Sequence, residues 1–202
     1  MKFKKKIDEL ISSLNHNQKI EFGIFCNKRV LDLYKKVDET EDLTIVDSSI
    51  AKGHAFERLS NIFLHITKDK DLGDLKIKEF NLCEPLVLDV EEIFDNTTEN
   101  EVSMLVAQGV DYLLRYLLNN DGRYIRSISI NTIEILNQLK SHEYYQESDD
   151  DDKLDDYLNP IYEEELRIQI KGLEYIRKDD LNSLDKLISK SKINFKKNAV
   201  YE

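Results

Sequence analysis

Residues 98–122, which read TENEVSMLVAQGVDYLLRYLLNNDG, decide the fold class of this chain. Apolar side chains recur here every three or four positions, which is the spacing of one face of an α-helix. They are Val102, Leu105, Val106, Val110, Leu113, Leu114 and Leu117. Thr98 and Glu101 have the spacing of a capping box, and Asn119 to Gly122 is a strong turn signal. The stretch therefore predicts a helix from Thr98 to about Asn119.

The same periodicity continues on both sides of this helix. Further helices are expected over about 3–14, 16–37, 47–68 and 123–144, and a last one from Asp180 or Asn182 to Ile188. Asn15 is positioned to cap the second of them. Asn159 is expected to cap another, with Pro160 at its first position and Glu163, Glu164 and Glu165 in its first turn. Residues 69–97 give no clear pattern, although 86–94 could form a short helix.

The fold class follows from this pattern and from the composition. Only 6 Gly and 2 Pro occur in 202 residues, so the tight turns that an all-β fold needs are scarce. We expect one all-α domain, residues 1–202, built as a bundle of about seven or eight helices. Within it, residues 146–157 should form an acidic surface loop. Residues 192–202 should form a flexible basic tail.

The net charge of −11 limits the classes of molecule that the chain is expected to bind. A nucleic-acid backbone would be repelled by most of such a surface, whereas a basic protein would be attracted to it. Excess negative charge also serves solubility, so it does not prove a partner. No stretch approaches the ~20 apolar residues of a membrane span, and Asp8 and Glu9 interrupt the only run near the N-terminus. We therefore expect a cytoplasmic protein that binds neither nucleic acid nor membrane.

Residue patterns that carry chemistry are absent from the sequence. No Glu-x-x-His, His-Glu-x-x-His or glycine-rich phosphate loop occurs, so we expect no catalytic, cofactor-binding or metal-ligating residues. Cys26 and Cys83 are expected to be buried thiols. His54 and Glu57 have the spacing of a surface pair on one helix. The enzymatic alternative is a site that the fold assembles from dispersed residues around Glu57, His54 or Cys26.

The densest charge lies in residues 147–156, ESDDDDKLDD, where seven of ten positions are acidic. The run has no Gly, which a calcium-binding EF-hand loop requires at its turn. It is either a solvated loop or a docking patch for a basic protein, with tyrosines at its edges that add contact area. The candidate partner-binding residues are Glu147, Asp149, Asp150, Asp151, Asp152, Asp155, Asp156, Tyr145 and Tyr157.

Two segments resemble a known family. The first contains Ile11, Leu14, Gln18 and Phe22, followed by Lys28-Arg29-Val30 and Tyr34, and the second runs from Asn159 through Leu166 to Gln169. Both are similar to segments of the YjaG-like family of uncharacterised bacterial proteins. The second helix of that family ends with a Pro-Asn-Tyr, and the proline is missing here. The resemblance implies an all-α fold but no function and no catalytic residues, and the acidic run is not part of the family pattern.

These observations favour a protein that works by presenting a surface. The leading hypothesis is a non-enzymatic protein-binding protein, in its most concrete form an immunity protein that neutralises a basic toxin by direct binding. The expected partner is a protein with a basic surface. The alternatives are the helical enzyme described above and a homo-oligomeric adaptor with a housekeeping role, so a homodimer is left open.

Overall fold

The structure, a computed structural model, describes residues 2–35, 54–87, 98–148 and 150–195. The α-helices of these residues are α1 (Lys2–Ser12), α2 (His16–Val30), α4 (Ala55–Lys68), α5 (Leu75–Cys83), α6 (Thr98–Asn119), α7 (Gly122–Glu147), α8 (Leu154–Arg177) and α9 (Leu181–Lys190). Short 3-10 helices cover Leu31–Tyr34, Glu84–Leu86 and Asp151–Lys153. The described residues contain no strand, which confirms the all-α fold.

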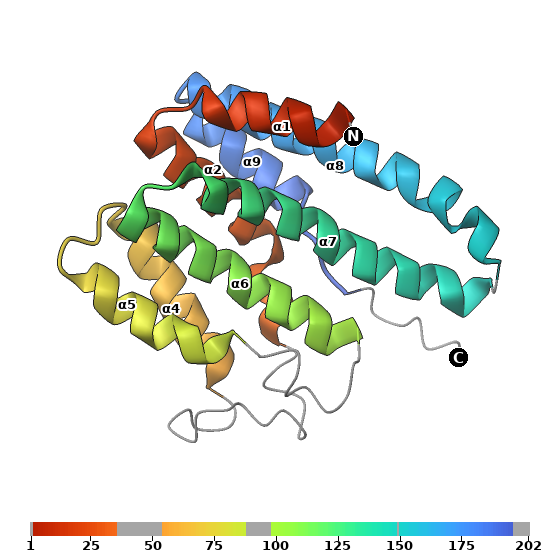
Figure 1. Cartoon of the computed structure of the whole chain (residues 1–202), viewed down its shortest axis with the longest axis horizontal. Helices are drawn as coiled ribbons and strands as arrows, with labels where there is room; N and C mark the ends of the chain where they lie inside the picture. Colours follow the sequence, from red (N-terminus) through yellow and green to blue (C-terminus); the bar gives the residue numbers. More distant parts are fainter. Residues whose placement is uncertain (1, 36–53, 88–97, 149, 196–202) are drawn as a thin grey trace.

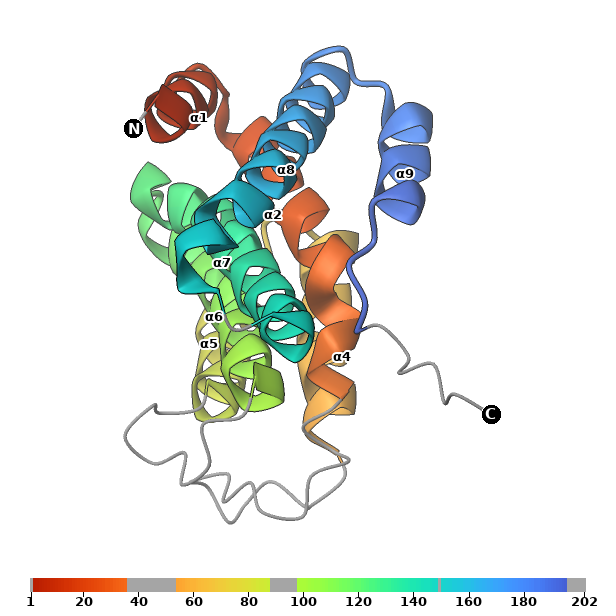
Figure 2. The same ribbon diagram turned by 90° about the vertical axis from the view of Figure 1, so that its right-hand side faces the viewer.

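Helices α6 and α7 form a long antiparallel hairpin, and the other helices pack on its two sides (Figure 1). Helix α6 has the bounds that its periodicity predicts, and Asn120 reverses the chain with a φ of 52°. Asp121 then caps α7 by accepting a hydrogen bond from the backbone N–H of Arg123 at 2.9 Å. Helices α4 and α5 lie on the α6 side of this hairpin, and α1, α8 and α9 lie on the other side (Figures 1 and 2).

Helix α2 passes through the middle of the bundle and contributes to the centre of its core. Asn15 caps this helix as expected, and Gln18 completes a capping box with it. Phe22, Phe25 and Cys26 on α2 are fully buried. The buried apolar residues form one cluster that includes side chains from every α-helix from α1 to α9 named above. The chain is therefore organised around α2, with the other helices packed about it (Figure 2).

Some expected boundaries differ from the structure. Helix α2 ends at Val30 and continues as a 3-10 turn over Leu31–Tyr34, although 16–37 was expected as one helix. Helix α5 lies within residues 69–97, the region that gave no clear pattern. It was not predicted because its apolar side chains do not follow a regular helical period. The residues expected to be helical at 47–53 and 88–94 lie outside the described part of the chain.

The expected start of α8 is wrong. This helix begins at Leu154, so Pro160 lies inside it and Asn159 is not a cap. Both ends of the acidic run are consequently helical: α7 extends to Glu147, and Asp155 and Asp156 lie in the first turn of α8. Those two carboxylates lie next to the positive end of the helix dipole, which explains why the helix starts before the proline. Between the two helices the described residues are Ser148 and Asp150 to Lys153, of which Asp151–Lys153 form a 3-10 helix.

The C-terminal segment also differs from the expected tail. The backbone N–H of Ile193 donates a hydrogen bond to the carbonyl of Arg29 at 2.8 Å, and the Ile193 side chain is buried. Lys192 pairs with Asp32. Residues 191–195 are therefore docked on the end of α2, because their backbone and apolar groups find partners there. Residues 196–202 lie outside the described part of the chain.

Both cysteines are buried and free, as expected. Burial raises the pKa of the Cys26 thiol to about 12 and also raises that of Cys83. Since the thiolate is the reactive form, neither should react with a disulfide reagent such as Ellman's reagent at pH 8 until the protein unfolds. A thiol titration with and without denaturant measures this. A Ser189→Cys variant, exposed on α9, is the positive control; reaction of a native cysteine at the rate of that control would contradict the prediction.

Candidate functional site

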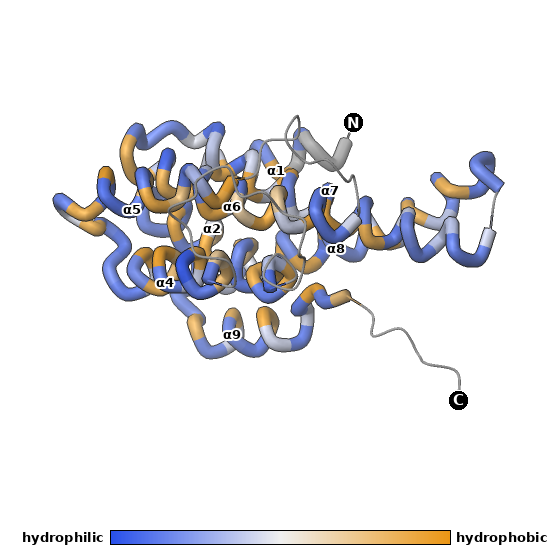
Figure 3. Tube along the Cα trace, turned by 90° about the horizontal axis from the view of Figure 1, so that it is seen from below, coloured by the Kyte–Doolittle hydropathy of each residue, from blue (hydrophilic) through white to orange (hydrophobic). Residues whose placement is uncertain are grey.

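The residues of the predicted docking patch come together at the far end of the α7–α8 hairpin. This end projects beyond the other helices of the bundle (Figures 1 and 3). We call residues 144–157 the acidic tip; Asp149 belongs to it in sequence but lies outside the described residues. The structure therefore places eight of the nine predicted partner-binding residues on one protruding feature.

Three tyrosines brace the acidic tip. The ring of Tyr144 lies 5.7 Å from that of Tyr145 and 5.2 Å from that of Tyr157, measured between centroids. Tyr144 donates a hydrogen bond to the backbone carbonyl of Asp150 at 2.7 Å, and Tyr145 donates one to Oδ1 of Asp151 at 2.9 Å. The bond to Asp151 raises the pKa of Tyr145. The aromatic cluster thus fixes the turn that carries the carboxylates.

Most of the charge on the tip faces solvent. Lys153 pairs with Asp150 at 2.5 Å, and it is the one basic residue in the run 147–156. Asp151, Asp152, Asp155 and the other described acids of the run are exposed, apart from the partly buried Asp150. Tyr145 and Tyr157 are 46% and 37% exposed. The tip therefore presents uncompensated carboxylates beside accessible aromatic surface.

A second polar feature lies inside the protein, where α2 meets α8. Arg29 and Glu165 form a bidentate ion pair. Nη1 of Arg29 donates to Oε1 of Glu165 at 2.7 Å, and Nη2 donates to Oε2 at 2.6 Å. Both side chains are 1% exposed. Such parallel bonds between a guanidinium and a carboxylate are strong and directional. The pair joins residues 136 positions apart in the sequence.

Neighbouring groups complete the hydrogen bonding of this ion pair. Gln169 donates to Oε1 of Glu165 at 2.8 Å and accepts from the hydroxyl of Ser129 on α7 at 2.6 Å. Nε of Arg29 donates to the backbone carbonyl of Ser191 at 3.1 Å. The network therefore ties α2, α7, α8 and the C-terminal segment together, and its charges compensate each other. That arrangement suits a structural role better than proton transfer.

A groove opens above the buried ion pair, with a volume of about 370 Å³. Arg29 and Glu165 form its floor, and Glu164 and Lys192 contribute polar groups to its lining. The walls are apolar and come from α7, α8 and the C-terminal segment: Leu136, Pro160, Ile161, Ile168 and Ile193. Pro160 and Ile161 are about one turn of α8 beyond Tyr157, the last residue of the acidic tip, so the groove begins next to the tip.

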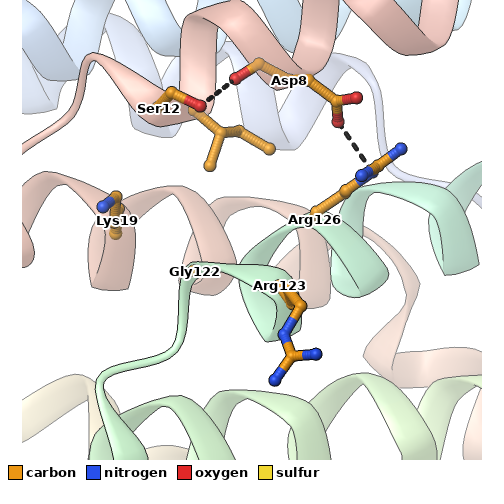
Figure 4. A pocket seen from close by; sticks show the side chains of 7 residues that line it. Asp8, Ser12, Lys19, Gly122, Arg123 and Arg126 are labelled. Carbon is orange, nitrogen blue, oxygen red and sulfur yellow. Dashed lines mark hydrogen bonds and ion pairs between the residues drawn. The ribbon is translucent and has the colours of Figure 1, made fainter.

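A smaller pocket of about 220 Å³ lies between α1, α2 and the start of α7 (Figure 4). Its basic side chains point in different directions, and two of them are paired: Arg126 with Asp8 at 2.7 Å, and Arg123 with Asp121 at 2.6 Å. Lys19 lies on the opposite side of the pocket from Arg126 in Figure 4. The pocket therefore does not gather its cations around one point, as an anion site would require.

The residues of the enzymatic alternative do not converge. The His54 and Glu57 side chains are 66% and 70% exposed at the start of α4 and pair with each other at 3.2 Å. Cys26 is fully buried, and its raised pKa keeps it protonated. These three side chains do not form the common pocket that this alternative needs.

The sequence pointed to the buried network only indirectly. Arg29, Glu165 and Gln169 all lie in the two segments that resemble the YjaG-like family, and the fold brings those segments into contact. Glu165 was expected in the first turn of a helix; this is wrong, because α8 starts at Leu154, eleven residues earlier. Ser129 carried no signal in the sequence that would have singled it out.

Among the described residues, no group of three or more His, Cys, Asp or Glu side chains is arranged to hold a metal ion. Within the same part of the chain, no helix has the length and apolar content that a bilayer crossing requires.

Comparison with known proteins gives a fold-level relative. No family model matches the sequence, and no curated protein matches it. A solved structure of a DUF416 family protein from Shewanella baltica OS155 has a TM-score of 0.65 with 17% sequence identity. The similarity covers 92% of this chain and 94% of that chain. At this identity the likeness shows a shared fold alone, and the resemblance to the YjaG-like family stays a prediction.

Proposed function

We propose that this protein binds a protein partner with a basic surface, and that the acidic tip is the part that meets it. The observation that carries the proposal is the position of the tip: this end of the α7–α8 hairpin projects beyond the other helices (Figure 1), and it bears exposed carboxylates and two accessible tyrosines. Charge of this kind speeds the encounter with a basic partner, and tyrosines add contact area at a low entropic cost. In its most concrete form the partner is a basic toxin, which this protein neutralises.

The packing of the tip supports a role in recognition. The ring contacts of Tyr144 and the hydrogen bond from Tyr145 to Asp151 hold the turn in one arrangement before any partner arrives. A surface that is ordered in advance loses less conformational entropy on binding. A solubilising loop has no need of this bracing, so the tyrosine cluster favours the docking interpretation.

The proposal predicts that neutralising the tip weakens partner capture. A tip-neutral variant replaces Asp149–Asp152 with asparagine. A matched body-neutral variant removes the same number of charges from exposed positions elsewhere: Glu57→Gln, Glu174→Gln, Asp179→Asn and Asp185→Asn. Because exposed charge pairs contribute about 0.2–1 kcal/mol each, we expect the tip-neutral variant to lose about tenfold in affinity at low salt.

The dependence of affinity on ionic strength shows whether the tip-neutral variant binds more weakly because it has lost charge or because it no longer folds. Salt screens exposed charges, so the affinity of the wild type should approach that of the tip-neutral variant as salt is raised. The basic partner is first captured from an extract of the native source with the immobilised wild-type protein. The affinity is then measured by titrating each immobilised variant with that purified partner. Equal affinities of the tip-neutral and body-neutral variants at every salt concentration would reject the proposal.

A further inference from the structure

The groove beside the acidic tip has the size and the lining of a small binding pocket. Its volume of about 370 Å³ lies at the low end of the range of about 300–1,000 Å³ that ligand pockets span. The walls are aliphatic, and the charges of the floor already satisfy each other through the Arg29–Glu165 pair. The groove therefore suits an apolar group, since it offers no unpaired charge at its base to hold an ionic one.

The spacing of residues on α8 connects this groove with the tip. Ile161, Glu164 and Ile168 follow each other at three and four positions, so they lie along one face of the helix. Tyr157, four positions before Ile161, continues this face into the acidic tip, whereas Asp155 and Asp156 lie roughly 110–150° around the helix from it. From Asp156 to Ile168 the helix rises roughly 18 Å. One extended segment of about six residues, or a helix of about twelve, is long enough to cover both features.

Pro160 adds a feature at the junction between groove and tip. Proline has no N–H, so it cannot donate the usual helix hydrogen bond to the carbonyl of Asp156, four positions earlier. Both residues are exposed. The Asp156 carbonyl therefore lacks the helix hydrogen bond that an N–H at position 160 would donate, and it lies next to the exposed Asp156 carboxylate. Acceptor groups of this kind match a segment with Lys or Arg side chains.

We propose that the groove takes an apolar side chain of the same basic partner that contacts the acidic tip. The inference rests on the proposed function and names the partner more closely. The recognised segment carries Lys or Arg side chains that meet the tip and, roughly 6–18 Å further along α8, an aliphatic or aromatic side chain that fills the groove. Charge complementarity favours a basic partner, because the tip carries uncompensated carboxylates. The groove next to the tip offers apolar area to an apolar side chain of that same partner.

Synthetic peptides test the two halves separately against the full chain. The first peptide carries four lysines, a six-residue Gly-Ser spacer and a Leu-Phe pair. The second replaces the Leu-Phe pair with serines, and the third replaces the lysines with glutamines. Fluorescence anisotropy measures binding of each labelled peptide. We expect the first to bind at least tenfold tighter than either of the others, because only it uses both tip and groove.

Two point variants localise the apolar contact. Ile161→Asp places a charge in the wall of the groove and should remove the tenfold advantage of the first peptide. Ile77→Asp, on α5 at a position 65% exposed, should leave it unchanged. Circular dichroism checks that both variants fold. A benzophenone in place of the Phe of the first peptide provides a second readout that needs no variant, and it should cross-link to residues 160–168.

The outcomes distinguish this inference from the proposed function. Equal affinity of the first two peptides, together with weaker binding to the tip-neutral variant, would overturn the groove assignment and leave the tip standing. Lysine peptides that bind the tip-neutral variant as tightly as the wild type would reject the proposed function itself. A tenfold gain in affinity for the third peptide after truncation behind Phe195 would assign the groove to the chain's own C-terminal residues and overturn the partner assignment.

Discussion

Glu165→Ala will lower the free energy of unfolding by about 3–5 kcal/mol, because it leaves the guanidinium of Arg29 buried without its partner. The two side chains are 1% exposed and joined by bonds of 2.6 and 2.7 Å. Gln169 loses an acceptor in the same variant. Urea unfolding followed by circular dichroism measures the change.

The neighbouring position supplies a control for this prediction. Glu164 is 61% exposed on the same helix, and Glu164→Ala should change the stability by no more than about 0.5 kcal/mol. The double variant Arg29→Met with Glu165→Leu removes both charges, so it should recover most of the stability that the single variant loses. A loss below about 1 kcal/mol in Glu165→Ala would show that the pair is not held as the structure describes.

Gly172→Ala will destabilise the contact between α8 and α2 by about 1–3 kcal/mol. A β-carbon at this position would lie 2.7 Å from Cε1 and Cζ of the fully buried Phe25 ring. Alanine is otherwise the better helix former by about 1 kcal/mol, so steric overlap must outweigh that gain. The ring cannot move aside easily, because the core is close-packed around it. Urea unfolding measures this change as well.

Gly122→Ala is the matched control for the second prediction. The nearest atom to its new β-carbon is Nζ of Lys19 at 3.8 Å, so the change should be neutral or slightly stabilising. Phe25→Leu combined with Gly172→Ala should show a favourable coupling energy, since the smaller side chain makes room. Equal stabilities of Gly172→Ala and Gly122→Ala would contradict the close approach of the two helices.

The helices that local signals define were predictable from the sequence. Helix α6 has its expected bounds because its periodic face and the Asn119–Gly122 turn act within a few residues of each other. The cap of Asn15 on α2 is equally local. The start of α8 was missed because Pro160 usually marks a first helical turn, whereas Asp155 and Asp156 extend the helix before it.

The candidate site was only partly predictable, for a different physical reason. The composition of residues 147–156 identified the acidic tip without any knowledge of the fold. The ion pair of Arg29 and Glu165 depends on a contact across 136 positions, which no local pattern encodes. The groove needs side chains from α7, α8 and residues 191–193 together, so it exists only in the folded chain.

The central claim is that the acidic tip carries partner recognition, and one comparison tests it most directly. Wild-type, tip-neutral and body-neutral proteins are immobilised and exposed to an extract of the native source, and the captured proteins are quantified by mass spectrometry. We predict that the wild-type and body-neutral proteins recover the same basic protein and that the tip-neutral protein recovers about a tenth as much at low salt. Equal recovery by all three proteins, or recovery of general chaperones alone, would contradict the account.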